Sequence, residues 1–338
     1  MRLSVLDQSP VPEGTSAAQA IANTVDLAQH TERLGYHRYW LAEHHNSNAL
    51  AGSSPEVLIG HVANATSTIR VGSGGVMLSH YSAYKVAENF RMLHTLYPDR
   101  IDLGVGRAPG SDHLTAAALA KGPGKLGIEY YPNQVVELFR WLDDSIEPDS
   151  QFVDVHATPT GPGMPEMWVL ASSPDSAGIA AHLGLPLAWA HFITYADGEA
   201  VCEAYRNQYR PSDVHPEPKV LVAASVICGW DDEDADRAAA SIRSWRASSR
   251  RGAIPSAEDA GQDLAVFKKR IPVDDGRKPM IVGGADKVHE QLEELAERHG
   301  ADELSLVTIT HAHEDRVRSY ELIADAFALQ HDGSETAS

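Results

Sequence analysis

The stretch Ile101-Asp-Leu-Gly-Val-Gly-Arg-Ala-Pro-Gly-Ser-Asp112 is a short apolar strand that runs directly into a glycine-rich turn carrying one arginine. Gly104 and Gly106 suggest the loop that binds a dinucleotide pyrophosphate, but that loop requires a helix to open inside the glycines. Pro109 follows here, so we expect the chain to remain a loop. The alternative interpretation is that Arg107 projects from a strand end and binds a phosphate or carboxylate with its planar donor group.

Strands and helices alternate on both sides of this stretch. Apolar runs predict strands, and apolar residues spaced three or four apart predict helices between them. The other predicted strands are Leu3–Asp7, Arg38–Ala42, Ile69–Gly75, Met167–Ala171, Pro186–Phe192, Val220–Cys228 and Glu303–Thr310. Eight strands, each followed by a helix through mostly short connections, favour a closed parallel (β/α)8 TIM barrel with insertions.

The remaining segments are predicted to be additions to one barrel domain that spans residues 1–330. Ala116–Gly127 is an insertion rich in alanine, lysine and glycine, and Phe152–Ala157 has the pattern of a small extra hairpin strand. Residues 250–278 are irregular, and we interpret them either as a mobile lid or, more commonly for such a composition, as a disordered surface loop. Residues 331–338 are polar and predict a flexible tail.

Charge and composition narrow the classes of partner. The chain has 338 residues, with 47 acidic and 28 basic side chains and a formal net charge of −19. This balance argues against nucleic acid and against an anionic membrane, where basic surfaces supply affinity. The two cysteines, Cys202 and Cys228, have no metal-type spacing, and no apolar run of about 18 residues occurs. We therefore expect a cytoplasmic protein that binds small molecules.

In a barrel of this kind, function lies in the loops that follow the strands. Arg107 follows one strand, and Ser172-Ser173-Pro174 opens a helix directly after the neighbouring strand. Free backbone N–H groups at a helix start bind anions, as does an arginine side chain. Together these two features predict a phosphate pocket.

Other strand ends carry glycines and histidines, each with two interpretations. Gly74–Gly75 could admit a planar ring close to the backbone, or could serve a loop that needs permissive dihedrals. His44 and His45 could handle protons, or be hydrogen-bonded structural residues, and no third residue at helical spacing supports a metal. His311 and His313 share a face of an extended stretch, so one of them could point into the barrel mouth.

Four stretches, taken together, resemble the bacterial luciferase-like flavin-dependent monooxygenases, and in particular a branch labelled luciferase family oxidoreductase group 1. They are Trp40–His45, Val71–Met77, Arg100–Asp112 and Ala301–Leu304, and the resemblance covers nearly the whole chain in order. It implies a barrel enzyme, usually a homodimer, that takes reduced FMN from a separate reductase. The flavin then reacts with O₂, and its hydroperoxide oxidises a small organic substrate.

The resemblance also implies roles for individual residues. His44 resembles the active-site histidine, Gly74–Gly75 the non-proline cis peptide beneath the flavin ring, and Arg107 the phosphate arginine. Ser173 and Ser176 resemble the hydroxyl ligands of the phosphate. The predicted catalytic residues are His44, with His191 and His311 lining the substrate side, and the predicted cofactor-binding residues are Gly74, Gly75, Met77, Arg107, Ser172, Ser173 and Ser176.

Two positions depart from the luciferase pattern. Gly106 stands where luciferase has a reactive cysteine, and Ser172 where it has a glutamate, so we do not expect long-chain aldehyde oxidation with light emission. Two rival functions remain. One is F420-dependent hydride transfer on the same barrel, and the other is a non-catalytic flavin-binding subunit, against which His44 and Arg107 at one mouth argue.

Overall fold

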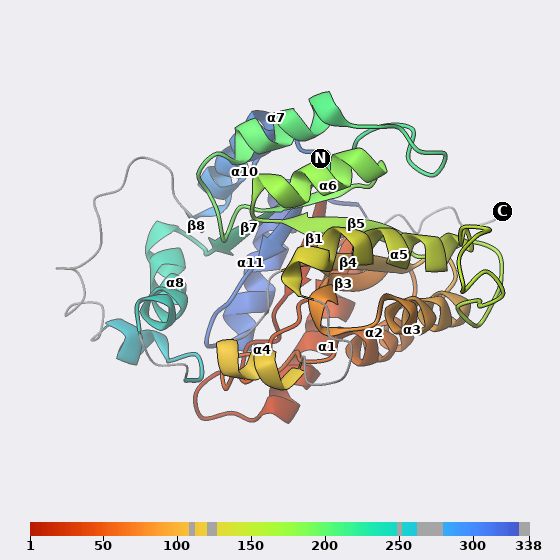
Figure 1. The fold of residues 1–338 in the computed structure, drawn as a ribbon. Coiled ribbons are helices and arrows are strands. Elements are labelled where there is room, and N and C mark those ends of the chain that lie inside the picture. The colour runs from red at the N-terminus through yellow and green to blue at the C-terminus, as the bar shows by residue number, and fades with distance from the viewer. Residues whose placement is uncertain (108–111, 120–126, 249–251, 262–279, 331–338) are drawn as a thin grey trace, which may run out of the picture.

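The computed structural model describes residues 1–107, 112–119, 127–248, 252–261 and 280–330, and it shows a closed barrel of parallel strands surrounded by helices (Figure 1). Eight strands pair in the order β1-β2-β3-β4-β5-β6-β7-β9, and β9 pairs back with β1. The predicted TIM barrel is confirmed. The strands are β1 Arg2–Asp7, β2 Arg38–Leu41, β3 Arg70–Met77, β4 Ile101–Gly106, β5 Glu166–Ala171, β6 Leu187–Ala190, β7 Val220–Cys228 and β9 Glu303–Val307.

Helices cover the outside of the barrel, and all of the α-helices in the described ranges except α4, which has no buried residues, bury one face of their side chains. In α10, Val288, Leu292 and Leu295 are buried, as their spacing predicts. The described helices are α1 Ala17–Arg33, α2 Pro55–Ala65, α3 Ala83–Leu96, α4 His113–Leu119, α5 Tyr131–Asp143, α6 Pro174–Leu183, α7 Gly198–Gln208, α8 Asp232–Ala247, α10 Ala285–His299 and α11 His313–Ala326, with short 3₁₀ turns η1 Leu78–His80 and η2 Ile128–Tyr130. None of the helices in the described ranges is long and apolar enough to cross a membrane.

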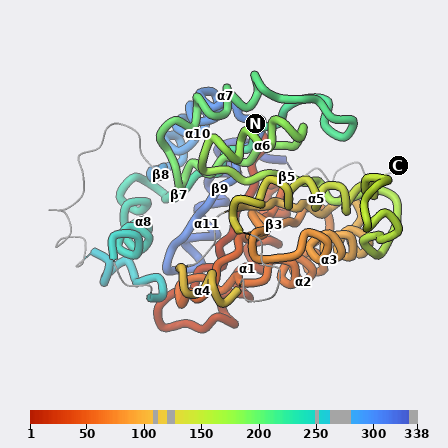
Figure 2. Tube along the Cα trace, in the orientation of Figure 1, coloured from red at the N-terminus to blue at the C-terminus, as the bar shows by residue number. Residues whose placement is uncertain are grey.

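A ninth strand, β8 Met280–Gly283, was not predicted from the sequence. It pairs with Ser225–Cys228 at the carboxyl end of β7, next to α8 (Figure 2). The reason is that β6 ends at Ala190, two residues before the predicted Phe192, and pairs only with the first part of β7. The edge that β6 leaves free is therefore taken by β8, whose four-residue apolar run is too short to stand out in the sequence.

The predicted hairpin strand at Phe152–Ala157 is wrong. Residues 151–154 form turns, and Val153 and Val155 donate their backbone N–H groups to oxygens only three residues earlier. A strand needs a partner edge, and none of the described strands pairs with this segment. Phe152 packs its ring against Trp141 of α5 instead.

Most of the predicted irregular segment 250–278, part of the Ala116–Gly127 insertion and the predicted tail 331–338 lie outside the described residues. Residues 252–261 are described, and they pack against the loop that follows β1. Ile254 is fully buried, donates to Val11 and accepts from Glu13. These residues, the 8–16 loop and α4 gather at the carboxyl end of the barrel (Figures 1 and 2).

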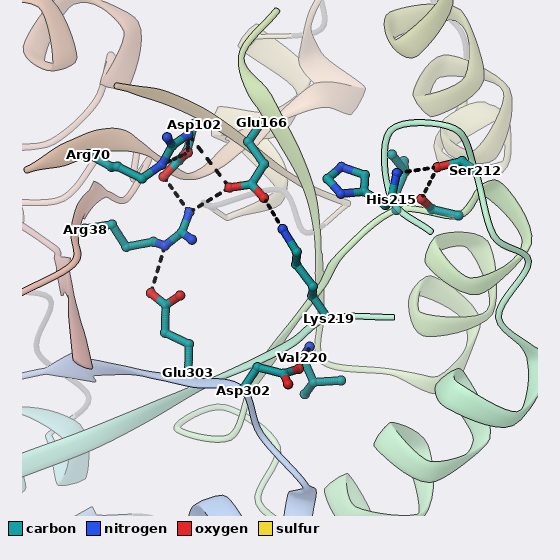
Figure 3. Close-up of polar contacts among 12 residues, drawn as sticks. Arg38, Arg70, Asp102, Glu166, Ser212, His215, Lys219, Val220, Asp302 and Glu303 are labelled. Atoms are coloured by element: carbon teal, nitrogen blue, oxygen red, sulfur yellow. Dashed lines mark hydrogen bonds and ion pairs between the residues drawn. The ribbon is translucent and has the colours of Figure 1, made fainter. Parts of the chain in front are cut away.

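The amino end of the barrel is closed by a cluster of charged side chains centred on Arg38 (Figure 3). The Arg38 guanidinium lies 2.8 Å from a carboxylate oxygen of Asp102 and 2.8 Å from one of Glu303. It also packs 4.9 Å from the centroid of the Trp168 ring. Because a buried charge is costly unless it is paired, this cluster stabilises one arrangement of the strand starts. It forms the layer beneath the cavity described next.

Candidate functional site

A cavity of about 520 Å³ opens at the carboxyl ends of the strands and extends into the barrel. The cavity is lined in part by Gly106, Ala188, Ala190 and Ala223. Because glycine has no side chain and alanine only a methyl group, these residues leave the interior hollow. Trp40 also lines it, packed edge to face against Trp168 with ring centroids 5.5 Å apart. A concave, largely apolar pocket at this end of a TIM barrel is where such folds place their ligands.

The structure brings most of the predicted site residues to this one cavity. Two of the predicted residues, His191 and His311, are not among its lining residues. The eight that line it are His44, Gly74, Gly75, Met77, Arg107, Ser172, Ser173 and Ser176. The strand ends that carry them are therefore adjacent in space, as the barrel topology predicts.

One end of the cavity places an arginine side chain beside the start of a helix. Arg107 Nη2 donates to Ser173 Oγ at 3.1 Å, which holds the guanidinium against the start of α6. Ser173 is the N-cap residue of α6 but does not cap it with its side chain, and Pro174 follows as the first helical residue. The N–H groups of the first helical turn thus have no side-chain cap at a positive helix end. Asp175 lies 3.7 Å from Arg107, but it is largely exposed, so an anion would displace this weak pair at little cost.

The Gly74–Gly75 peptide bond is cis, as the resemblance implied. Neither glycine has a positive φ, so permissive dihedrals do not explain the pair. A Cβ on Gly74 would lie 2.5 Å from Leu6 Cδ1, and one on Gly75 2.6 Å from the Gly104 carbonyl oxygen. Side chains are therefore excluded here by the close packing of β3 against its neighbours, and the backbone is left as the cavity wall.

Gly106 differs from these packed glycines. A Cβ at this position would meet only Met77 Sδ, at 3.9 Å. The cysteine that luciferase has at this position would therefore fit here. The fold does not require a glycine, and the glycine leaves the cavity larger than a cysteine would.

His44 lies in the loop after β2, where its backbone N–H donates to the Gly52 carbonyl at 2.8 Å. Burial, followed by the neighbouring His45, lowers the pKa of His44 from 6.5 to about 4. Its imidazole is therefore neutral at pH 7. The Nδ1 atom is buried and has no hydrogen-bond partner in the described part of the chain, so it is available to a ligand in the cavity.

Glu43 is a residue whose importance the sequence reasoning missed. Its fully buried carboxylate accepts from the Met77 N–H at 2.9 Å, from the Tyr81 hydroxyl at 2.6 Å, and contacts His45 Nε2 at 2.6 Å. It thereby ties the end of β2 to the end of β3 beside the cis peptide. The sequence signal for this role was an acidic residue placed between a buried strand and two histidines. A carboxylate that is buried there requires several hydrogen-bond donors around it.

His191 and His311 lie away from the cavity. The His191 ring packs edge to face against His299 of α10, with centroids 5.3 Å apart, and burial and His299 lower its pKa to about 4. His311 Nε2 lies 3.2 Å from the Glu13 carbonyl oxygen. His313 opens α11 and contacts Asp26 at 2.7 Å, so neither histidine of that pair points into the mouth. Neither His191 nor His311 is therefore among the residues that line the cavity in the described part of the chain.

One apolar cavity is thus bordered by the end where Arg107 meets the start of α6, by the Gly74–Gly75 wall, which has no side chains, and by the neutral His44 ring. These residues fit a planar cofactor that carries a phosphate, since each of its chemically distinct parts meets a matching surface. No group of three or more histidine, cysteine, aspartate or glutamate side chains in the described ranges is arranged to hold a metal ion. The features define a TIM barrel with a deep, largely apolar cavity at the carboxyl ends of its strands.

Comparison with known proteins identifies the family. The family model for luciferase-like monooxygenases matches residues 1–303, and the chain belongs to this family. Among its relatives, the uncharacterized protein YwcH of Bacillus subtilis (strain 168) is 44% identical over 96% of this chain and 99% of that protein. The N-acetyl-S-alkylcysteine monooxygenase of the same organism is 35% identical over 96% of this chain and 98% of that enzyme.

Solved structures agree with this assignment. The crystal structure of apo-MsnO8 is 39% identical, with a TM-score of 0.89, over 97% of this chain and 99% of that chain. More distant structures share the fold alone. One is an FMN complex of the oxygenating constituent of 3,6-diketocamphane monooxygenase from Pseudomonas putida, with 18% identity and a TM-score of 0.70. Another is an F420-dependent secondary alcohol dehydrogenase, with 14% identity and a TM-score of 0.67.

Proposed function

We propose that this protein is an FMN-dependent monooxygenase that oxidises a small organic substrate with O₂. The observation that carries the proposal is that Arg107 and the uncapped start of α6 face the same cavity as Gly74–Gly75 and His44. Arg107, Ser173 and Ser176 would hold the FMN phosphate. Ser172, Met77 and the glycine pair would border the rest of the cofactor.

Bound reduced FMN supplies the electrons that activate O₂, and the protein supplies binding, orientation and a dry environment. The apolar walls, including Ala190, Phe192 and Ala223, exclude water from the reacting groups. His44, neutral at pH 7, would accept or return a proton at Nδ1, the atom that has no partner among the described residues. We propose catalytic roles for neither His191 nor His311, because the cavity does not reach them.

Monooxygenation is favoured over F420-dependent hydride transfer by the named relatives. The N-acetyl-S-alkylcysteine relative is a monooxygenase and is 35% identical, whereas the F420-dependent dehydrogenase is only 14% identical and shares the fold alone. The resemblance further supports a separate flavin reductase and a homodimer, and the charge and composition of the chain support a cytoplasmic protein that binds neither nucleic acid nor membrane. Sedimentation of the purified protein at twice the chain mass of 36.6 kDa would support the dimer, and a monomer mass would exclude it.

The substrate class is suggested by the same relative. N-acetyl-S-alkylcysteines carry a small apolar thioether that matches the apolar cavity, so N-acetyl-S-methylcysteine is the first substrate to test. Incubation of this compound with the protein, chemically reduced FMN and O₂ should give a product one oxygen atom heavier, detected by mass spectrometry, in larger amount than without the protein. If no substrate in a broad panel gives such a product, although FMN binds, the non-catalytic flavin-binding subunit becomes the better account.

The phosphate contact provides the sharpest test of the proposed cofactor. Arg107→Ala should weaken FMN binding roughly 10- to 100-fold, the usual effect of losing a charge-assisted hydrogen bond, and should change riboflavin binding by less than about 2-fold. Arg140→Ala is the matched control, because Arg140 on α5 is equally exposed, at 37%, but lies outside the cavity. Fluorescence titration of both flavins and of F420 gives the dissociation constants. Equal weakening of FMN and riboflavin, or tighter binding of F420 than of FMN, would contradict the proposal.

A further inference from the structure

The wall of the cavity opposite the proposed cofactor site carries one polar side chain. The phosphate-binding residues follow β4 and β5, and the cis peptide lies in β3, so the proposed FMN occupies that side of the barrel. The other wall is formed by β6, β7 and β9. Its described lining residues from these strands are Ala188, Ala190, Leu221, Ala223 and Ser305. Ser305 is the one among them with a hydrogen-bonding side chain.

Ser305 points into the barrel by the alternation of β9. Glu303, two residues earlier on the same face, contacts Arg38 in the charged cluster beneath the cavity. Ser305 is therefore one layer above that cluster, and it pairs in register with Ala223 of β7. It is 1% exposed, and its Oγ has no hydrogen-bond partner among the described residues.

Other buried serines of the barrel strands do have partners. Ser4 donates to Glu303, and Ser73 donates to the Gly104 carbonyl oxygen at 2.8 Å. A buried hydroxyl without a partner loses its hydration and gains nothing in return, so native structures rarely retain one unless a ligand or water completes it. Because Ser305 borders the cavity, a small rotation of its side chain would bring the buried hydroxyl to a bound molecule.

We propose that Ser305 is a substrate-binding residue that donates a hydrogen bond to an uncharged acceptor, such as a carbonyl oxygen, on the part of the substrate that faces the β6, β7 and β9 wall. This inference rests on the proposed function, because it assigns the opposite wall to FMN. The acceptor is uncharged because no charged side chain lines the described β6, β7 and β9 wall, and a buried charge without a partner is strongly disfavoured. Alanines at three positions of that wall provide room for the apolar body of the substrate.

The test compares two ligands of the same shape, cyclohexanone and methylenecyclohexane, which differ only in a carbonyl oxygen against a CH₂ group. With the wild-type protein saturated with oxidised FMN, calorimetry or ligand-observed NMR should show tighter binding of the ketone. Ser305→Ala should lower ketone affinity roughly 3- to 10-fold, the range for one neutral hydrogen bond, and leave the alkene within about 2-fold. Ser305→Thr keeps the hydroxyl and should retain the preference for the ketone.

Ser241 provides a matched control. It is also 1% exposed and its Oγ also has no partner in the described ranges, but it lies on α8 outside the cavity. Ser241→Ala should leave both ligands unaffected. The inference would be overturned if Ser305→Ala left the ketone affinity unchanged or weakened the ketone and the alkene equally. It would also be overturned if Ser305→Ala weakened the binding of FMN or riboflavin, because Ser305 would then contact the flavin.

FMN binding by the wild-type protein is measured first, so that a failure of the proposed function can be distinguished from a failure of the inference about Ser305. If FMN does not bind, the proposed function is wrong, and the ketone and alkene are compared on the protein without flavin. A ketone preference that Ser305→Ala removes would then still support the hydrogen bond.

Discussion

At the scale of single residues, the environment of His44 determines its chemistry more than its identity does. A histidine in water is partly protonated near neutral pH, whereas burial lowers the pKa of His44 to about 4. The side chain is therefore a neutral proton acceptor when the cavity is occupied. The spacing of residues along the sequence gave no indication of this burial.

His44→Asn should lower the rate at which oxygenated product forms from N-acetyl-S-methylcysteine by roughly 100-fold or more, the usual contribution of a positioned acid–base group. The dissociation constant of FMN should change by less than about 2-fold, since the phosphate residues are untouched. His61→Asn, at an exposed position of α2, is the control and should behave as wild type. A wild-type rate in His44→Asn with normal FMN binding would exclude the proton-transfer role.

At the scale of secondary structure elements, the starts of the strands are held together by charge. Arg38 begins β2 and pairs with side chains from β4, β5 and β9 (Figure 3). Burial alone would raise the pKa of Glu166, but Arg38 and Lys219 beside it lower that pKa to about 2. The cluster thus contains both a buried cation, Arg38, and a half-exposed one, Lys219.

Arg38→Met should destabilise the protein by roughly 3 kcal/mol or more, because it leaves Glu303 buried without its cation. Lys219→Met removes a charge from the same cluster, but its side chain is 48% exposed, so the loss should be about 1 kcal/mol or less. The midpoints of guanidinium unfolding, measured on both variants at pH 7, distinguish these outcomes. Equal shifts would mean that burial of the pair is not what stabilises the strand starts.

At the scale of the whole molecule, buried histidines make stability depend on pH. The pKa values of His44 and His191 fall to about 4, and those of His37, His94, His215 and His299 are lowered by burial as well. Between pH 6.5 and 4 the unfolded chain therefore binds more protons than the folded chain. The stability present above pH 6.5 is lost progressively as the pH falls through this window.

His191→Asn should reduce this acid sensitivity, because one titrating site is removed. Between pH 7 and pH 5 its free energy of unfolding should fall less than that of wild type, by on the order of 1 kcal/mol after allowance for partial exposure of the ring. Urea unfolding at pH 7, 6 and 5 measures the difference. The exposed variant His61→Asn should follow the wild-type dependence, and a His191→Asn curve parallel to wild type would contradict the assignment.

The sequence by itself determined the barrel, and in outline which residues meet at the cavity. Apolar runs and helical spacing are local patterns, and a parallel barrel brings all strand ends to one mouth, so Arg107, Ser173, Gly74 and His44 could be placed together before any coordinates. Local pattern could not reveal β8, whose four residues acquire a partner only because β6 ends early.

Only the tertiary structure decided which way side chains at the strand ends point. His44 and His191 both follow strands, yet one lines the cavity and the other packs against α10. The same holds for Glu43, whose donors come from two other segments, and for Ser305, whose hydroxyl lies at the cavity wall without a partner among the described residues. Orientation and burial depend on contacts between residues far apart in the chain, and the spacing of residues along the sequence does not contain them.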